Sequence, residues 1–328
     1  MKRKYLIIFG LILLLAVDFY ASNLHRKEVY VALQWQPQAE FAGYYVAQEL
    51  GFYKEHGFDV KFIHENDNSE IIKLIKSGKT EFAVLSLVSA IVWNDDGLDL
   101  INIAQMQQKS DLSYVAKYNS GIFEVSDINN KRVALYDSEY KSLQKAFLNK
   151  HNIEAILIPV ISGINLFLYG GVDLLPVKRY NEYHTLLNSG LNSNELTLFP
   201  LEEYGLDIPG TGIYCRKSFY KNNPSICNQF VNATVKGWQY AFNNPDKAIK
   251  IVNKRMYESK MMTNSVHQKW MLNRMDDIMI PGKGNILNTH LNILGFELTA
   301  EILKNDGIIK TIPKYNEFYM PVGNNVKK

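Results

Sequence analysis

Aromatic and amide side chains follow the first strand that the sequence predicts. Residues 29–33 alternate as a β-strand does, and apolar residues at helical spacing resume at Phe41. Between them stand Trp35 and Gln38. Ligands of open α/β sheets bind beyond the carboxyl ends of the strands, where a tryptophan face can stack on a heteroaromatic ring. We therefore predict that Trp35 and Gln38 contact a small flat ligand; the alternative for Trp35 is a packed aromatic at the edge of a lobe.

Two further strand ends carry hydroxyl or carboxylate groups. Ser86 follows a short buried strand predicted over residues 81–85, where a hydroxyl binds a polar ligand atom or caps the next helix. Tyr136 and Asp137 end another predicted strand, which the order of elements places across a cleft from Trp35. We include Ser86, Tyr136 and Asp137 among the candidate ligand contacts.

Glu182 is a candidate for binding an amino group. It stands in the first turn of a helix predicted over residues 181–187, after a strand predicted over residues 173–177. A carboxylate there can accept charge-assisted hydrogen bonds from an exocyclic amine. The alternative is a carboxylate that only stabilises the positive end of the helix dipole. Asn181, beside it, can either cap the helix or donate to a ligand.

Several kinds of chemistry lack the residues that they need. The chain has no glycine-rich phosphate loop and no Gly-x-Ser-x-Gly motif, and its seven histidines include no close pair with metal-ligand spacing. We therefore expect no catalytic residue, no metal and no cofactor. The formal net charge is +3, with acidic and basic residues scattered along the chain, which gives no sign of nucleic-acid binding.

The order of the predicted elements indicates an α/β protein with two doubly wound lobes. Strands and helices alternate, and the chain is long enough for two domains of ordinary size. The pattern breaks at residues 119–121 and 207–212, as in a chain that leaves one lobe, builds the second and returns. We expect a discontinuous first lobe of residues 28–118 and 210–328 and a second lobe of residues 121–206. Two crossover strands would join them, with a ligand cleft between the lobes.

The N-terminus has the layout of a secretion signal. Three basic residues precede an apolar run over residues 5–17, which is short for a membrane span. Residues 1–22 are therefore predicted to be a signal peptide or, if uncleaved, a membrane anchor. The two cysteines, Cys215 and Cys227, could pair in an oxidising compartment or remain as buried thiols.

Family motifs occur in three parts of the chain. The first runs from Gln34-Trp35-Gln36-Pro37-Gln38 through Phe41-Ala42-Gly43-Tyr44-Tyr45 to Gly51-Phe52-Tyr53-Lys54-Glu55-His56-Gly57; the others are Tyr180-Asn181-Glu182-Tyr183 with Glu203-Tyr204-Gly205, and Asn244-Pro245-Asp246-Lys247-Ala248. Over residues 28–260 the chain thereby resembles the NMT1/THI5-like family. That family comprises periplasmic solute-binding proteins of ABC importers for thiamine-pyrimidine precursors, relatives that bind sulfonates, and a fungal branch that makes the pyrimidine. The resemblance implies a type II periplasmic-binding-protein fold with its ligand between the lobes.

The resemblance also bears on individual residues. Tyr44 and Tyr45 are adjacent on a predicted helix, so one of them can reach the cleft while the other packs in the core. Tyr45 matches a family position and is assigned to the ligand site, and the match also favours a ligand role for Glu182. Thiamine-pyrimidine binders tend to read Asp-Trp-x-Pro-Asn followed by a histidine, where this chain has Gln34, Gln38 and Phe41. These differences leave the ligand's identity open, and Phe41 belongs either to the site or to the core. The histidine and the cysteine-rich motif of the fungal branch have no counterpart at the matching places, which argues against an enzyme.

We therefore predict a monomeric solute-binding protein on the periplasmic or outer face of the membrane. It would close on a small, pyrimidine-like ligand and deliver it to the transmembrane subunits of an ABC permease, and it would touch the membrane only through an uncleaved N-terminal segment. The alternative is a sensory module that reports ligand occupancy to a signalling partner, and a thiamine-pyrimidine synthase is less favoured. The sequence does not distinguish importer from sensor.

Overall fold

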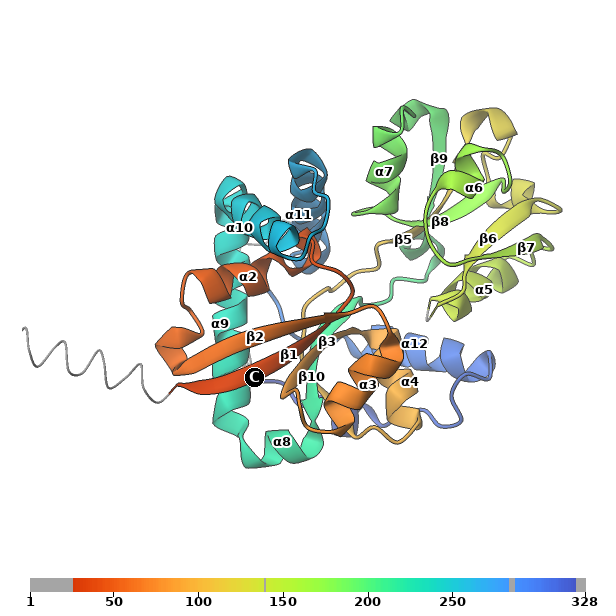
Figure 1. The fold of residues 1–328 in the computed structure, drawn as a ribbon. Coiled ribbons are helices and arrows are strands. Elements are labelled where there is room, and N and C mark those ends of the chain that lie inside the picture. The colour runs from red at the N-terminus through yellow and green to blue at the C-terminus, as the bar shows by residue number, and fades with distance from the viewer. Residues whose placement is uncertain (1–25, 139, 283–286, 323–328) are drawn as a thin grey trace, which may run out of the picture.

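The computed structural model describes residues 26–138, 140–282 and 287–322, which form two lobes (Figure 1). A five-stranded mixed sheet lies at the centre of each lobe, so the predicted α/β fold with two doubly wound lobes is confirmed. The signal or anchor predicted for residues 1–22 lies outside the described residues. Within the described ranges, no helix combines the length and the apolar character needed to cross a membrane.

The sheet of the first lobe has the strand order β2-β1-β3-β10-β4. Strand β1 pairs in parallel with β2 and β3, whereas β10 runs antiparallel between β3 and β4. The strands are β1 (Lys27–Gln34), β2 (Phe58–Glu65), β3 (Phe82–Ser86), β4 (Leu100–Gln105) and β10 (Thr211–Arg216). Strands β3 and β4 are buried throughout, because helices cover both faces of this sheet.

Two groups of helices cover the first sheet (Figure 1). One face packs on η1 (Ala39–Phe41), α2 (Ala42–Glu49), α9 (Pro224–Asn243), α10 (Pro245–Glu258) and α11 (Ser265–Met279). The other face packs on α3 (Asn68–Lys76), α4 (Leu87–Asp95), α12 (Ile293–Asn305) and α13 (Tyr315–Phe318). The short helices η2 (Lys54–His56) and α8 (Lys217–Asn222) complete the lobe.

The sheet of the second lobe has the strand order β7-β6-β8-β5-β9. Its strands are β5 (Leu112–Lys117), β6 (Arg132–Tyr136), β7 (Ile156–Val160), β8 (Leu174–Lys178) and β9 (Leu196–Pro200). Its helices are η3 (Tyr118–Ser120), η4 (Val125–Ile128), α5 (Lys141–Lys150), α6 (Asn165–Leu168), α7 (Glu182–Asn188), η5 (Ser193–Glu195) and η6 (Leu201–Tyr204). Because β5 pairs with β8 and β9, the expected end of the first lobe's opening segment at residue 118 is wrong, and the chain crosses before β5.

The error at β5 has a physical cause. In each sheet, the strand that arrives from the other lobe lies antiparallel between two strands of the receiving lobe: β10 lies between β3 and β4, and β5 between β8 and β9. The apolar run over residues 112–117 predicts a buried strand, but it does not say which sheet the strand joins. Only the pairing partners, which are distant along the chain, decide that.

The two connections between the lobes run side by side. Residues 106–111 lead from β4 to β5, and residues 205–210 lead back to β10. The Gly210 N–H donates to the Gln107 carbonyl at 3.1 Å, and the Ser110 N–H donates to the Asp207 carboxylate at 3.0 Å. The connections are therefore bonded to each other, and a hinge motion between the lobes must bend both together.

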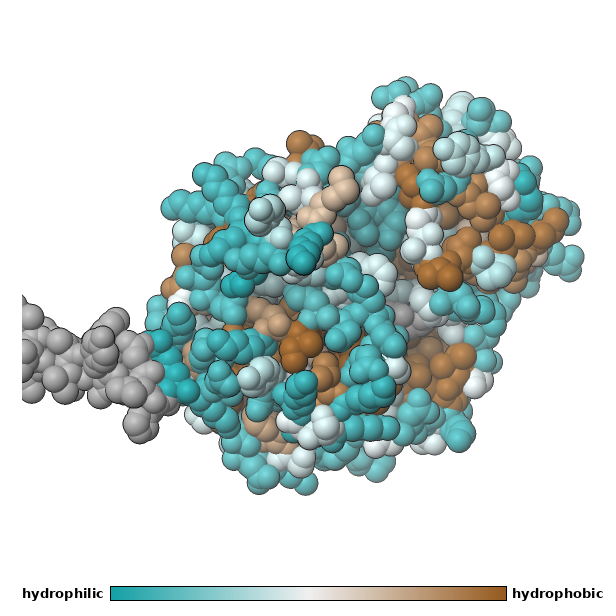
Figure 2. Space-filling view, in the orientation of Figure 1, coloured by the Kyte–Doolittle hydropathy of each residue, from teal (hydrophilic) through white to brown (hydrophobic). Residues whose placement is uncertain are grey.

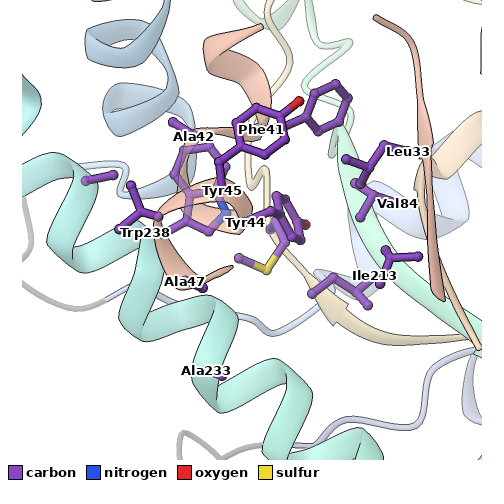
Figure 3. Close-up of a cluster of buried hydrophobic side chains, with 14 of the residues drawn as sticks. Leu33, Phe41, Ala42, Tyr44, Tyr45, Ala47, Val84, Ile213, Ala233 and Trp238 are labelled. Carbon is purple, nitrogen blue, oxygen red and sulfur yellow. The ribbon is translucent and has the colours of Figure 1, made fainter. Parts of the chain in front are cut away.

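Helices α2 and α9 approach closely over a pair of glycines. A Cβ placed on Gly43 would overlap the Trp238 ring, and one placed on Gly237 would overlap the carbonyl of Gly43. The Trp238 indole packs edge-on against Tyr44, with ring centroids 6.0 Å apart (Figure 3). This contact holds the helix that follows the Trp35 segment against the core of the first lobe.

The last described residues cover the edge of the first sheet. After α13, Tyr319 forms a parallel bridge with Asn102, and the Met320 N–H donates to the Asn102 carbonyl at 2.9 Å. This contact protects an edge strand from pairing with other chains. Of the two states expected for the cysteines, the structure has the thiols: Cys215 and Cys227 are free and buried in the same core.

The outer edge of the second lobe is apolar. Strand β7 exposes Ile156 and Leu157, and Figure 2 shows hydrophobic surface over this part of the lobe. Pro159 lies within β7 and lacks the N–H that a further strand would need. The proline therefore blunts an edge that would otherwise favour strand pairing.

Candidate functional site

A cavity lies between the two lobes, at the carboxyl ends of β1, β6 and β8. It contains about 690 Å³ of space outside protein atoms, part of it open to solvent. The first lobe contributes Gln34, Trp35, Gln38, Glu40 and Thr211, and the second contributes Tyr136, Ser138, Tyr140, Ile161, Ser162, Lys178, Tyr180, Asn181 and Glu182.

Trp35 forms part of the first lobe's wall. Its side chain is 44% exposed, unusual for a tryptophan, and its backbone has φ 112°. Bulky residues rarely adopt positive φ, and such strain gathers at functional sites. The loop that follows β1 thus presents an aromatic face at the cavity instead of burying it.

Gln38 and Glu40 complete this wall with buried polar groups. The Gln38 amide donates to the Glu40 carboxylate at 2.7 Å, and both residues are more than nine-tenths buried. The Gln34 amide is held from the neighbouring strand end: its oxygen accepts from the Ser86 N–H at 3.0 Å and its nitrogen donates to the Ser89 hydroxyl at 3.0 Å. This wall therefore offers fixed hydrogen-bonding groups beside the Trp35 ring.

Lys178 and Glu182 form the charged part of the second lobe's wall. The Lys178 ammonium donates to the Tyr140 hydroxyl at 3.1 Å, and it lies 4.3 Å from the ring centroid of Tyr140 and 5.4 Å from that of Tyr180. The Lys178 backbone N–H donates to the Glu182 carboxylate at 3.0 Å. The wall thus presents one cation between two phenol rings, next to one carboxylate.

Burial and charge act on these two groups in opposite directions. Burial raises the pKa of the Glu182 carboxyl, and the Lys178 ammonium and backbone N–H partly offset that rise. Burial by itself lowers the pKa of Lys178, but the Tyr140 and Tyr180 hydroxyls and the Glu40 carboxylate outweigh it and raise that pKa well above its ordinary value. Lys178 is therefore a cation at neutral pH, and it faces carboxylates from both lobes.

Five of the nine predicted ligand contacts line the cavity. They are Trp35, Gln38, Tyr136, Asn181 and Glu182. They come together because the carboxyl ends of β1, β6 and β8 face each other across the gap between the lobes.

The other four predicted contacts lie elsewhere. Phe41 and Tyr45 are buried in the core of the first lobe (Figure 3), because the short helix η1 turns the chain inward after Gln38. Ser86 caps α4, accepting from the Ser89 N–H at 3.1 Å, and lines a hollow near the hinge that adjoins the cavity at Tyr140, Lys178 and Tyr180. Asp137 points outward and pairs with Lys141 at 2.9 Å. We therefore withdraw these four as direct contacts with a ligand in this cavity.

Glu40, Lys178, Tyr140 and Tyr180 also line the cavity, and the sequence reasoning missed them. Lys178 ends β8, so the strand-end argument that selected Trp35 applies to it as well. Tyr180 follows within two residues and could have been found in the same way. Glu40 carries no such signal, because nothing local shows that its carboxylate is 6% exposed and faces a cavity.

The lobes also touch on both flanks of the cavity. On one flank, His184 of α7 and His267 of α11 are joined through their Nδ1 atoms at 2.8 Å, and His267 Nε2 donates to the Asn181 side-chain oxygen at 3.1 Å. On the other, the Asp306 carboxylate of α12 accepts from the Ser142 hydroxyl of α5 at 2.8 Å. Opening the cleft must break these contacts, so the described conformation holds the lobes together.

Aromatic rings and charged groups line the same cavity. Aromatic faces, two carboxylates and one ammonium converge on a small space, as required to hold a flat ring that carries both donors and acceptors. Among the described residues, no three His, Cys, Asp or Glu side chains gather in a way that could hold a metal ion.

Comparison with known proteins identifies related sequences. The family model described as NMT1/THI5 like matches residues 38–248. The riboflavin-binding protein RibY of Chloroflexus aurantiacus is 24% identical over 69% of this chain, and the match spans 65% of RibY, just under two thirds of its length. The 4-amino-5-hydroxymethyl-2-methylpyrimidine phosphate synthase THI11 of Saccharomyces cerevisiae is 24% identical over 66% of this chain and 68% of the synthase. The formylaminopyrimidine-binding protein of Halalkalibacterium halodurans is 22% identical over 73% of this chain and 76% of that protein.

Solved structures share the fold. The periplasmic aliphatic sulphonate binding protein SsuA from Escherichia coli superposes with a TM-score of 0.68 over 89% of this chain and 97% of that one, at 12% identity. At that identity the likeness concerns the fold alone, and it confirms the predicted periplasmic-binding-protein architecture.

Proposed function

The chain belongs to the NMT1/THI5-like family, and from this membership we propose that it is an extracytoplasmic solute-binding protein that closes its lobes on a small, pyrimidine-like ligand. The cavity between the lobes carries the proposal, because residues of both lobes line it. A ligand that touches both walls stabilises the closed state by contacts absent from the open one. Such a protein delivers its ligand to an ABC permease that recognises the closed form.

The charges of the cavity favour an aminopyrimidine over a sulfonate. A sulfonate needs several donors around a full negative charge, whereas the cavity offers the Lys178 ammonium against the Glu40 and Glu182 carboxylates. An aminopyrimidine can donate from its amine to a carboxylate, accept at a ring nitrogen and stack on Trp35. The buried phenols of Tyr136 and Tyr180 add apolar surface for the same ring.

Synthesis of the pyrimidine fits this chain less well than binding does. The histidine and the cysteine-rich motif of the synthase branch have no counterpart at the matching places of this chain. His64, which lies beside Phe41, has both ring nitrogens engaged, by the Trp35 carbonyl and the Tyr45 hydroxyl at 2.8 Å each. We therefore propose a binding protein rather than a synthase, despite the synthases among its relatives.

Thermal unfolding with candidate ligands tests the proposal. The purified protein is scanned with an aminopyrimidine, riboflavin and a small alkanesulfonate, and each hit is measured by calorimetry. A ligand at a hundredfold excess over Kd stabilises the native state by ~2.7 kcal/mol. We expect the aminopyrimidine to raise the unfolding temperature and to be recovered chemically unchanged. A shift from the sulfonate alone would overturn the ligand class, and conversion of the ligand would overturn the binding role.

A matched pair of variants connects a hit to the cavity. Glu182→Gln removes the charge of a cavity carboxylate without changing its shape, so we expect it to weaken aminopyrimidine binding by about tenfold or more. Glu203→Gln makes the same change at an exposed position of the second lobe and should leave Kd unchanged. Equal effects of the two substitutions would show that the ligand binds elsewhere.

A further inference from the structure

Trp35 is held in its unusual backbone conformation by the end of the neighbouring strand. Its N–H donates to the Glu65 carbonyl at 3.0 Å, and its own carbonyl accepts from the His64 ring at 2.8 Å. In the described parts of the chain, three other non-glycine residues have positive φ, two of them asparagines, which tolerate it well. A tryptophan at φ 112° therefore needs surroundings that enforce its conformation.

His64 is fixed in turn by groups from the helical segment that follows Trp35. Its Nε2 atom lies 2.8 Å from the Tyr45 hydroxyl, and the Phe41 ring packs edge-on against the imidazole with centroids 5.4 Å apart. Burial lowers the pKa of His64 to about 4, so the ring is neutral at physiological pH. A carbonyl can only accept, so His64 Nδ1 carries the proton and Nε2 accepts from the Tyr45 O–H.

The contacts therefore form one directed chain of hydrogen bonds from Tyr45 through His64 to the Trp35 carbonyl. Neither Tyr45 nor His64 lines the cavity between the lobes. Tyr45 is 1% exposed, and its orientation is set by the core around α2. This series of hydrogen bonds thus connects the half-exposed Trp35 ring at the ligand site to the rigid core.

We propose that Tyr45 and His64 are positioning residues that hold the Trp35 indole in its binding orientation. The proposal rests on the proposed solute-binding function, and it gives the predicted ligand residue Tyr45 an indirect role. Without the bond from His64, the Trp35 segment relaxes toward negative φ, which turns the indole away from the cavity wall. Affinity for a stacked ring then falls although every group that touches the ligand is still present.

A pair of adjacent tyrosines provides the test and its control. Tyr45→Phe removes only the hydroxyl that reaches His64. Tyr44→Phe removes a hydroxyl from an equally buried neighbour whose ring packs on Trp238 instead. In protein labelled with ¹⁵N-tryptophan, the four indole N–H signals report each ring, and the Trp35 signal is assigned by its loss in Trp35→Phe.

The proposal predicts that Tyr45→Phe shifts or broadens the Trp35 indole signal and weakens binding of an aminopyrimidine by about threefold to tenfold, the effect of one lost hydrogen bond. Tyr44→Phe should change neither. A Trp35 signal that Tyr45→Phe leaves in place overturns the proposal. The indole signal is measured without a ligand, so this proposal and the proposed function can fail independently. If only the proposed function is wrong, Trp35 will still be ordered but the protein will bind no compound of the panel.

A second pair of variants keeps the test decisive if the phenylalanine variant is poorly folded. His64→Gln keeps an amide that can donate to the Trp35 carbonyl, whereas His64→Leu cannot donate. We expect the glutamine variant to retain the wild-type indole signal better than the leucine variant, and to bind more tightly. Equal spectra and equal affinities in the two variants would show that His64 has only a packing role.

Discussion

Replacing Trp35 by glycine should leave the protein more stable than replacing it by alanine. Both changes remove the same indole, so lost contacts cancel in the comparison. At φ 112° a residue with a Cβ bears a backbone strain of about 1–3 kcal/mol, and glycine does not. Glycine loses about 0.4–1 kcal/mol through the greater freedom of its unfolded chain. The remaining advantage for Trp35→Gly is on the order of 1 kcal/mol.

Urea unfolding followed by circular dichroism measures this difference. Lys61, exposed on β2, provides the control, because its backbone φ is not positive and glycine should there be less stable than alanine by roughly 0.5–1 kcal/mol. The order of the two substitutions should thus invert between Trp35 and Lys61. If Trp35→Gly is no more stable than Trp35→Ala, the backbone at Trp35 is not strained. The hydrogen bonds from Tyr45 through His64 would then have no strained conformation to support.

Three further predictions concern contacts between and within the lobes. Burial lowers the pKa of His184 and His267, so at these two groups the unfolded chain takes up protons first as the pH falls below about 6.5. The pair should therefore lower the free energy of unfolding between pH 7 and pH 5, and urea titrations at each pH should show a smaller contribution of this kind in His184→Gln than in the wild type. Asp306→Asn removes the partly exposed ion pair with Lys145 that joins α12 to α5, and it should weaken ligand binding by at most about fivefold at low salt. Asp246→Asn is the control, because its ion pair with Lys269 lies within the first lobe, and it should leave the Kd measured by calorimetry unchanged. Gly237→Ala forces a methyl group against the facing carbonyl of α2 and should destabilise the protein by about 1–3 kcal/mol in urea unfolding; a neutral result would contradict the close packing of α2 and α9.

Part of the site could be predicted because its positions depend on short-range sequence patterns. Trp35 and Gln38 follow an alternating strand, and Glu182 begins a helix soon after another, so local periodicity was enough to place them at a sheet edge. Phe41 and Tyr45 could not be placed in this way. A single turn of η1 decides whether residues beyond a strand end point into the cleft or into the core, and residue type alone does not specify that turn.

The sequence by itself determined the α/β class, the two lobes and the family. Strand and helix periodicity and the family motifs depend only on residues that are close together in the sequence. Tertiary structure alone decided that β5 belongs to the second sheet, that Glu40 and Lys178 line one cavity from opposite lobes, and that the Tyr45 hydroxyl bonds to His64. Each of these depends on pairing between segments far apart in the chain. The free energy of such a pairing comes from burial and hydrogen bonds that exist only once both partners are in place.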